Sequence, residues 1–321
     1  MAVYTKLSNN DINSILHNYK IGSLDNAAEI SAGVENTNYL LTTTTGKYIL
    51  TIFEKRVNRK DLPFFIDLMN FLAQNSFPSP KILANYKSYI FNFKAKTGVI
   101  ISFLTGDIAE NVTLNDDILF NLGNKLGQMH NLTAKFPLKR ANDFALNGIE
   151  KLYQTVKLKR LLQDEEQNLS INIINNFKSH NLTNLSKAII HADLFPDNIF
   201  VNADKICGVI DFYFSCHDYI NYDIATTINA WCFDDKLNFN LTFLNKLLKG
   251  YNFIKPLNAA DKKYLYDFCL LTALRFYLTR IYDKFHQPKN SNNIAKNPDE
   301  FLQRIKFWLN FTEMPRILEE I

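Results

Sequence analysis

The first third of the chain shows the two-residue period of strands more often than the period of a helix. Runs of alternating apolar and polar residues predict the strands of an antiparallel sheet, and they occupy residues 28–33, 38–43, 47–53, 81–86 and 98–104. Two segments have helical spacing instead: a short one at 8–20 and an amphipathic one at 61–74, which prolines follow. The pattern predicts a sheet of about five strands, a common sheet size, with a helix packed on it.

Beyond residue 104 the helical period dominates. Amphipathic segments predict helices at residues 114–132, 151–162, 165–177, 223–233, 240–251 and 263–285. Two short β runs, 187–192 and 205–214, suggest a hairpin among them, and the polar stretch 286–299 suggests a surface loop. We therefore predict a two-lobed α+β fold, with a small antiparallel-sheet lobe at 1–103 and a larger, mainly helical lobe at 104–321. Ligands commonly bind between two such lobes.

Composition excludes several classes of partner. The 321 residues are 47% hydrophobic and 21% charged, and the net charge is only +4, which is ordinary globular usage. Without a dense run of Lys and Arg, neither nucleic acid nor an anionic membrane is an expected partner. The polar N-terminus lacks a signal-peptide core, no apolar run is long enough to span a bilayer, and the four cysteines form no C-x-x-C pair. These features predict a cytoplasmic protein with reduced thiols; they do not set its oligomeric state.

Residues 189–200 read IIHADLFPDNIF, an apolar run followed by His191, Asp193 and Asn198. The next β run ends in Asp211. Protein kinases carry the spacing H-x-D-x-x-x-x-N and a later D-F-G aspartate. Phosphoryl transfer needs oxygen ligands because Mg²⁺ is a hard cation, and it needs one carboxylate free of metal to hold the attacking hydroxyl. The alternative interpretation, in which the acidic residues simply belong to turns, explains the combined pattern less well.

The segments HADLFPDNIF and GVIDFYFSC resemble the kinases of small hydroxyl compounds, the aminoglycoside phosphotransferase and choline kinase group of the protein-kinase-like superfamily. More narrowly, GVENTNYLLTT, YDIATTINAWCF and LRFYLTRIYD are similar to the homoserine kinases of that group. The resemblance runs nearly end to end. It implies a protein-kinase-like fold, ATP and Mg²⁺ as cofactors, and transfer of the ATP γ-phosphate to the hydroxyl of L-homoserine. The product would be O-phospho-L-homoserine, on the way to threonine.

The resemblance also implies a role for each motif residue. Asp193 is the expected catalytic carboxylate, which accepts or orients the substrate hydroxyl, while Asn198 and Asp211 are expected to hold the Mg²⁺ of the nucleotide. Asp223, at the expected start of a helix, is expected to brace the loop, and an acidic residue in a first helical turn is favourable in any case. His191 is expected to support the same loop by hydrogen bonding rather than by acid–base chemistry.

The expected nucleotide contacts lie in the sheet lobe. The resemblance places the turn with Gly33 and Asn36 over the ATP phosphates, although an ordinary hairpin turn has the same composition. Protein kinases carry a lysine on the third strand, and Thr51 takes that position here. Lys55 is therefore the candidate for the missing positive charge, with a surface position as the alternative. The connector between the lobes is expected to meet the adenine edge through the backbone of Ser102, Phe103 and Leu104.

Homoserine carries an ammonium, a carboxylate and a primary alcohol, and an arginine is the expected partner of the carboxylate. Arg275 and Arg280 lie in a helical segment rich in apolar residues, where a buried charge is costly without a partner. Each is therefore either a member of a structural ion pair or a ligand for an anion. Tyr213 and Trp231 are candidates for the wall of the acceptor site, with core packing as the alternative for Trp231.

Three other functions stay open at this point. The first is a kinase of another small alcohol, such as choline, ethanolamine or an aminoglycoside, although the arginines disfavour a polycationic antibiotic. The second is a non-catalytic nucleotide-binding scaffold, which the absent strand lysine would suit. The third is a metallohydrolase in which a metal is held by His191, Asp193, Asp211 and His217. The position of Asn198 fits this third alternative poorly.

Overall fold

The computed structural model describes residues 4–30, 36–54, 57–287 and 296–321. Its contacts divide the chain into two compact units. The first unit comprises Met1–Thr105 and Gly208–Tyr213, and the second comprises Gly106–Cys207 and Phe214–Ile321. The main segment of the first unit ends close to the division expected after residue 103. The short segment 208–213 joins the first unit, although the sequence pattern placed it in the second lobe.

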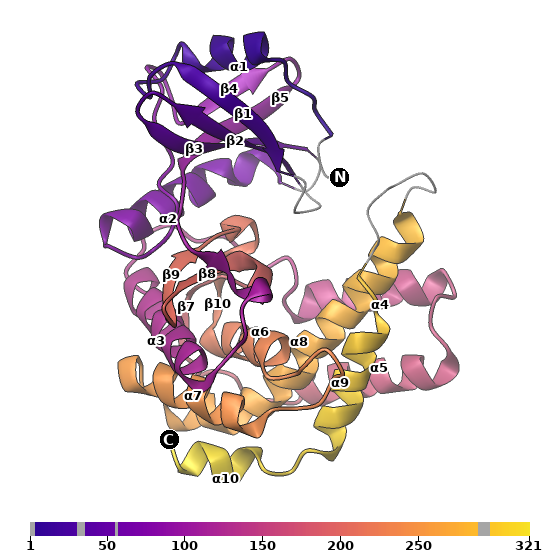
Figure 1. Cartoon of the computed structure of the whole chain (residues 1–321). Coiled ribbons are helices and arrows are strands. Elements are labelled where there is room, and N and C mark those ends of the chain that lie inside the picture. Colours follow the sequence, from indigo (N-terminus) through magenta and orange to yellow (C-terminus); the bar gives the residue numbers. More distant parts are fainter. Residues whose placement is uncertain (1–3, 31–35, 55–56, 288–295) are drawn as a thin grey trace. The chain divides into compact units, whose positions relative to one another are not determined.

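A five-stranded antiparallel sheet forms the centre of the first unit, as predicted (Figure 1). Its strands follow the order β1-β2-β3-β5-β4. Helix α1 (Asn9–Leu16) lies on one face of the sheet and α2 (Leu62–Gln74) on the other (Figure 1). The strand bounds are Leu24–Ile30 for β1, Asn36–Thr43 for β2, Gly46–Phe53 for β3, Ile90–Phe93 for β4 and Lys96–Ser102 for β5.

The two faces of this sheet carry different residues. Ile12 of α1 shares an apolar core with Tyr39 of β2 and Leu50 of β3, all of them buried. Because successive side chains of a strand point to opposite faces, Asn38 and Thr51 lie on the face away from α1. They pair across the strands, since Asn38 is opposite Thr51 in the register of β2 and β3.

The strand predicted at 81–86 is wrong. Ile82 makes only an isolated bridge to Ile101, and the strand that pairs with the far edge of β5 is β4. The side chain of Asn85 accepts hydrogen bonds from the N–H groups two and three residues further on, at 2.8 and 2.7 Å. This side-chain turn ends the extended segment before it can form a ladder.

Helices make up most of the second unit, as the helical pattern predicts. The long helix α8 (Ala259–His286) packs against α4, α5, α6 and α9 (Figure 1). Two helices, α9 and α10, are absent from the prediction, although buried Phe301, Ile305 and Trp308 stand at helical spacing in α9. The other helices are α3 (Asp116–Thr133), α4 (Leu146–Leu158), α5 (Asp164–Lys178), α6 (Ile220–Trp231), α7 (Leu241–Ile254), α9 (Asp299–Asn310) and α10 (Met314–Glu319).

The β runs after α5 pair differently from the prediction. Strand β7 (Lys187–Ile190) pairs with β10 (Cys216–Tyr219), and β8 (Ile199–Asn202) lies between β6 (Asp107–Ile108) and β9 (Lys205–Val209). The hairpin is therefore β8–β9, not a pair of 187–192 with 205–214. The two residues of its tight turn, Ala203 and Asp204, have positive φ values of 44° and 63°. Two-residue hairpin turns commonly have this backbone conformation. Residues 191–198 thus form a loop that connects β7 to β8.

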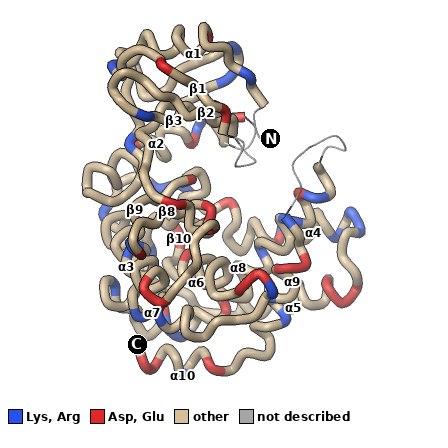
Figure 2. Tube along the Cα trace, in the orientation of Figure 1, with Lys and Arg blue, Asp and Glu red and all other residues tan. Residues whose placement is uncertain are grey.

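Residues of both charges occur along the chain in both units. Lys and Arg residues are interspersed with Asp and Glu residues along the chain (Figure 2). None of the helices that the structure describes is long and apolar enough to cross a membrane. All four cysteines are free, and three of them are buried.

Candidate active site

The 191–198 loop is anchored through its backbone by one buried carboxylate. Asp223 stands in the first turn of α6 and is fully buried. Its Oδ2 accepts a hydrogen bond from the N–H of His191 at 2.7 Å, and its Oδ1 accepts one from the N–H of Ala192 at 2.8 Å. Ala192 has a φ of +66°, a strained conformation for a residue with a side chain. Asp223 thus holds the start of the loop through two backbone hydrogen bonds.

This carboxylate is itself supported from two helices. Asp223 Oδ2 lies 3.0 Å from His130 Nε2 of α3, and His130 Nδ1 lies 2.8 Å from the Tyr251 hydroxyl of α7. Burial alone would raise the pKa of Asp223, but hydrogen bonds from His130 and from the His191 backbone hold that pKa below 3.8. Sequence reasoning missed His130, because a single histidine in an amphipathic helix carries no motif.

Trp231 also belongs to the support of the loop. Its indole Nε1 donates a hydrogen bond of 2.9 Å to the backbone oxygen of Leu194, and the side chain is buried. Trp231 therefore packs in the core, which was the alternative to a place in the wall of the acceptor site. Phe195, the residue after Leu194, packs edge-on against Phe276 of α8, with the ring centroids 4.9 Å apart. The loop is therefore fixed on both sides of Asp193.

Asp193 and Asn198 lie at the two ends of the anchored segment. Asn198 Nδ2 donates to the backbone oxygen of Asp193 at 2.9 Å, and the Asp193 N–H donates to His191 Nδ1 at 3.3 Å. The Asp193 side chain keeps 21% of its surface exposed, and its Oδ1 lies 3.5 Å from Arg275 Nη1. The backbone of the aspartate is fixed while its carboxylate remains accessible, which is the condition a catalytic carboxylate needs.

Asp211 and Tyr213 belong to the first unit. Asp211 follows β9 and has a φ of +65°, again a sparsely populated conformation. Tyr213 packs edge-on against Phe53 of β3 and Phe65 of α2, with ring centroids 5.1 and 5.7 Å apart. Burial and the charge of Asp211 raise the pKa of Tyr213, so this side chain stays neutral. The segment after β9 is thus packed onto the first unit by an aromatic side chain.

The nucleotide predictions fall partly outside the described residues. Gly33 and Lys55 lie there. Asn36 begins β2 and is buried, and its Oδ1 accepts no hydrogen bond from any residue that the structure describes. Thr51, in the position of the strand lysine, is buried and donates a hydrogen bond of 2.7 Å to Asn38 Oδ1. A neutral pair therefore occupies this place on the sheet.

Lys96, a cation of the same sheet, does not replace the missing lysine. It donates to the buried carboxylate of Glu54 and, at 2.6 Å, to the hydroxyl of Thr5. The hydroxyl of Thr37 donates to the same carboxylate at 2.6 Å. Thr37 alternates with Asn38 along β2, so this network lies on the α1 face and the Asn38 pair on the other.

The expected connector follows β5 and is held at its first residue. The N–H of Ser102 donates to the backbone oxygen of Lys81 at 2.9 Å, and its hydroxyl accepts a hydrogen bond from the Lys81 N–H at 2.9 Å. Phe103 is exposed, with the ammonium of Lys47 5.8 Å from its ring centroid, and Leu104 is half-buried. Ser102 therefore anchors the connector to the segment before β4.

Three buried arginines of the second unit differ in how they are satisfied. Arg280 donates to Glu300 Oε2 and to the backbone oxygen of Asn297, each at 2.7 Å. This contact is the structural ion pair that the sequence left open. Arg275 is 3% exposed and lies 3.7 Å from the ring centroid of Phe276, and its Nε finds no acceptor among the described residues.

The third arginine, Arg304 of α9, is missing from the sequence prediction. It is 7% exposed, and neither its Nε nor its Nη1 has a hydrogen-bond partner among the residues described. The available signal was its register: Arg304 follows Phe301 by three positions and precedes Trp308 by four, so a cation stands on the apolar stripe of the helix.

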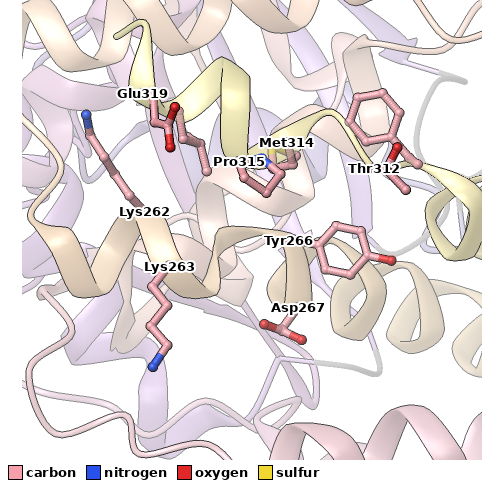
Figure 3. A pocket seen from close by; sticks show the side chains of 10 residues that line it. Lys262, Lys263, Tyr266, Asp267, Thr312, Met314, Pro315 and Glu319 are labelled. Atoms are coloured by element: carbon pink, nitrogen blue, oxygen red, sulfur yellow. The ribbon is translucent and has the colours of Figure 1, made fainter.

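A cavity at one end of α8 does not contain the predicted residues. A cavity of ≈ 630 Å³ lies between the first turns of α8 and the chain around α10. Lys262, Tyr266, Met314 and Glu319 are among its lining residues (Figure 3), and none of the residues proposed above lines it. No group of three His, Cys, Asp or Glu side chains suited to a metal ion occurs in the described part of the chain, although the metallohydrolase alternative needs one.

Known proteins are similar in sequence to this chain over most of its length. The profile described as the phosphotransferase enzyme family matches residues 26–257. The chain therefore belongs to the phosphotransferase enzyme family. Within this family it is similar to homoserine kinases: it is 37% identical over 311 residues to that of Mesorhizobium japonicum, with 96% of each sequence covered. It is 38% identical over 316 residues to that of Paramagnetospirillum magneticum, again with 96% of each sequence covered.

Solved structures are similar in fold. An amicoumacin kinase in complex with AMP-PNP and Ca²⁺ matches with a TM-score of 0.68 at 16% identity, over 95% of this chain and 92% of that one. A choline kinase from Cryptosporidium parvum matches with a TM-score of 0.66 at 15% identity, over 98% of this chain and 97% of that one. These likenesses confirm the predicted protein-kinase-like α+β fold.

Proposed function

We propose that the chain transfers the γ-phosphoryl group of ATP to the hydroxyl of L-homoserine, giving O-phospho-L-homoserine and ADP in threonine biosynthesis. The observation that carries the proposal is the anchored 191–198 loop, which leaves the Asp193 carboxylate accessible beside one buried arginine. The similarity to homoserine kinases supports the choice of acceptor. The acceptor needs a hydroxyl to reach Asp193 and an anion to face Arg275, and homoserine offers both.

Asp193 accepts a hydrogen bond from the substrate hydroxyl and orients the hydroxyl oxygen toward the γ-phosphorus. As the new P–O bond forms, the bond to the ADP oxygen breaks and the hydroxyl proton passes to the Asp193 carboxylate. Because the transition state is stabilised mainly by position and charge, the fixed backbone of Asp193 matters as much as its charge.

Asn198 and Asp211 are the residues we assign to Mg²⁺. Both offer hard oxygen atoms, which fits the ion. The Nδ2 of Asn198 is engaged with the Asp193 backbone, so its Oδ1 is the atom available to a cation. When bound, the ion neutralises phosphate charge. We assign the phosphates to Gly33 and Asn36, and we assign Lys55 the positive charge that the neutral Thr51 pair does not supply.

The contacts to adenine and to the acceptor are assigned to groups that have no partner among the described residues or remain accessible. The N–H of Ser102 is used by Lys81, so the adenine edge falls to the backbone of Phe103 and Leu104. Arg275 is assigned to the substrate carboxylate, and Tyr213 stays a candidate for the wall of the acceptor site. We place the reaction in the cytoplasm, which the four free cysteines support.

A coupled assay of ADP release tests the proposal with four acceptors: L-homoserine, choline, ethanolamine and an aminoglycoside. We expect turnover with L-homoserine at a kcat/KM well above those of the other three. Turnover of another alcohol without any of L-homoserine would overturn the acceptor and keep the kinase. ATP binding without ADP release from any acceptor would favour the nucleotide-binding scaffold instead.

A further inference from the structure

Arg304 is a buried cation whose partner is missing from the described residues. A guanidinium at 7% exposure with two unpaired nitrogen atoms is costly unless an anion completes it. Burial and the charge of Arg280 lower the pKa of Arg304 to about 10, which the charge of Glu300 offsets only in part, and the group remains charged at neutral pH. By contrast, Arg280 has Glu300 at 2.7 Å. The asymmetry between two arginines of one cluster indicates a place for a ligand anion.

Aromatic rings connect Arg304 to the loop that carries Asp193. The guanidinium of Arg304 lies 4.4 Å from the ring centroid of Phe301. Phe301 stacks on Phe276 at 5.0 Å, and the guanidinium of Arg275 lies 3.7 Å from the Phe276 ring. The 191–198 loop joins the same cluster through Phe195, which packs on Phe276. The two incompletely paired arginines thus lie on successive rings of one stack beside the catalytic aspartate.

The chemistry of these two arginines favours a carboxylate. Guanidinium groups packed on ring faces keep their N–H edges for hydrogen bonds, and these edges match the two oxygens of a planar carboxylate. Arg275 already approaches Asp193 with Nη1 at 3.5 Å, which leaves Nε on a different edge.

We propose that Arg304 is a specificity-determining residue, which binds the carboxylate of the acceptor. The inference rests on the proposed function, because it assumes an amino-acid acceptor. It goes further in requiring the carboxylate: an alcohol of the same length without that group leaves the Arg304 guanidinium unpaired. The cost of this defect discriminates between acceptors more strongly than the loss of a simple contact does.

The test compares L-homoserine with 3-amino-1-propanol, which is the same molecule without its carboxylate. For Arg304→Met we expect the KM for L-homoserine to rise roughly 10- to 100-fold, the loss of charge-assisted hydrogen bonds, with kcat and the KM for ATP within a few-fold of wild type. With the amino alcohol as acceptor, kcat/KM should stay nearly unchanged. The preference for the carboxylate should therefore collapse.

Matched variants separate binding from folding. Methionine replaces the buried cation with an apolar side chain of similar length, so Arg304→Met should keep or raise the Tm. Arg304→Lys keeps the charge but not the fork, and we expect a smaller rise in KM; it decides the matter if the methionine variant does not fold. Arg280→Met, which strands Glu300, should lower the Tm without changing the ratio between the two acceptors.

The outcomes distinguish the two proposals. A wild-type enzyme that turns over L-homoserine, with the same acceptor ratio in Arg304→Met and in Arg304→Lys, overturns the role of Arg304 and leaves the proposed function intact. A wild-type enzyme that phosphorylates the amino alcohol but not L-homoserine overturns both. A collapse of the ratio in the Arg304 variants alone supports the inference.

Discussion

Two buried polar regions of the second unit stand in contrast. Around Asp223, each carboxylate oxygen accepts from the 191–198 loop, and His130 uses both ring nitrogens. Around Arg275 and Arg304, three guanidinium nitrogen atoms have no partner among the described residues. Asp223 and Arg275 both contact the 191–198 loop. A fully paired network rigidifies its surroundings, whereas unpaired buried donors are tolerated where a ligand completes them.

We infer that the first region fixes the geometry of the loop and that the second recognises the substrate. Both oxygens of Asp223 accept hydrogen bonds from the protein, so we expect its replacement to reduce stability first. The arginines have N–H groups without acceptors among the described residues, so we expect their replacement to change substrate selection first. The following predictions test this division, beginning with the residue on which both regions converge.

Asp193→Asn should give the largest effect. The substitution keeps the size of the side chain but removes the charge that takes the hydroxyl proton, so we expect kcat to fall by roughly 10²- to 10⁴-fold. The Kd for ATP should change by no more than a few-fold, as measured by titration calorimetry. Turnover close to that of wild type would show that the base lies elsewhere.

Asp223→Asn should cost about 3–5 kcal/mol in the free energy of unfolding, because it breaks a buried charged network. Denaturant titration measures this loss, and hydrogen exchange should show faster exchange at the amides of His191 and Ala192. Asp234 is the matched control: it also accepts backbone N–H groups, but on an exposed turn. Asp234→Asn should cost much less, because water replaces the lost hydrogen bonds on an exposed turn, and equal losses would argue against a special role for Asp223.

The pH dependence of this difference has a definite sign. The pKa of Asp223 in the folded state lies below 3.8, so its stabilisation is complete above that pH and is lost as the pH falls through the folded-state pKa. Asp218 provides the opposite case, because burial raises its pKa. Its contribution is complete below 3.8 and is lost as the pH rises. The stability advantage of wild type over Asp223→Asn should therefore shrink as the pH falls. For Asp218→Asn the sign is opposite, because wild type loses stability relative to the variant as the pH rises.

Trp231→Phe should have the smallest effect. It removes the hydrogen bond to Leu194 and should cost about 1 kcal/mol of stability, with a fall in kcat of less than about 10-fold because the loop keeps its Asp223 anchor. Trp308→Phe is its control, since it removes a similar indole hydrogen bond to Asn229. A fall in kcat that is equal for both variants would mean that the loop is not what Trp231 supports.

The sequence predicted best those features that depend on local pattern. Alternation and helical spacing located the five-stranded sheet and most helices, and the spacing of Asp193 and Asn198 identified the loop. It failed where tertiary contacts or side-chain turns decide: Asn85 ended the expected strand at 81–86. A pattern read one segment at a time also gave the wrong partner for β7: it paired 187–192 with 205–214, whereas β7 joins β10 across the chain.

The candidate site shows the same limit. Motif residues could be named because their chemistry and spacing are shared by many kinases. His130 and Arg304 belong to no motif, and their importance comes from what surrounds them after folding. For Arg304 the clue was a cation on an apolar helix stripe, which becomes meaningful only when its missing partner is seen.

The network of Glu54 has a practical consequence for handling the protein. The backbone N–H groups of Tyr4 and Thr5 donate to the hydroxyl of Thr37, and that of Leu7 donates to the hydroxyl of Tyr39. These hydrogen bonds attach residues 4–7 to the sheet. Trimming the chain back past Leu7 would strip Glu54 of the Thr5 hydroxyl. Expression tags are therefore better attached through a spacer before these residues than in place of them.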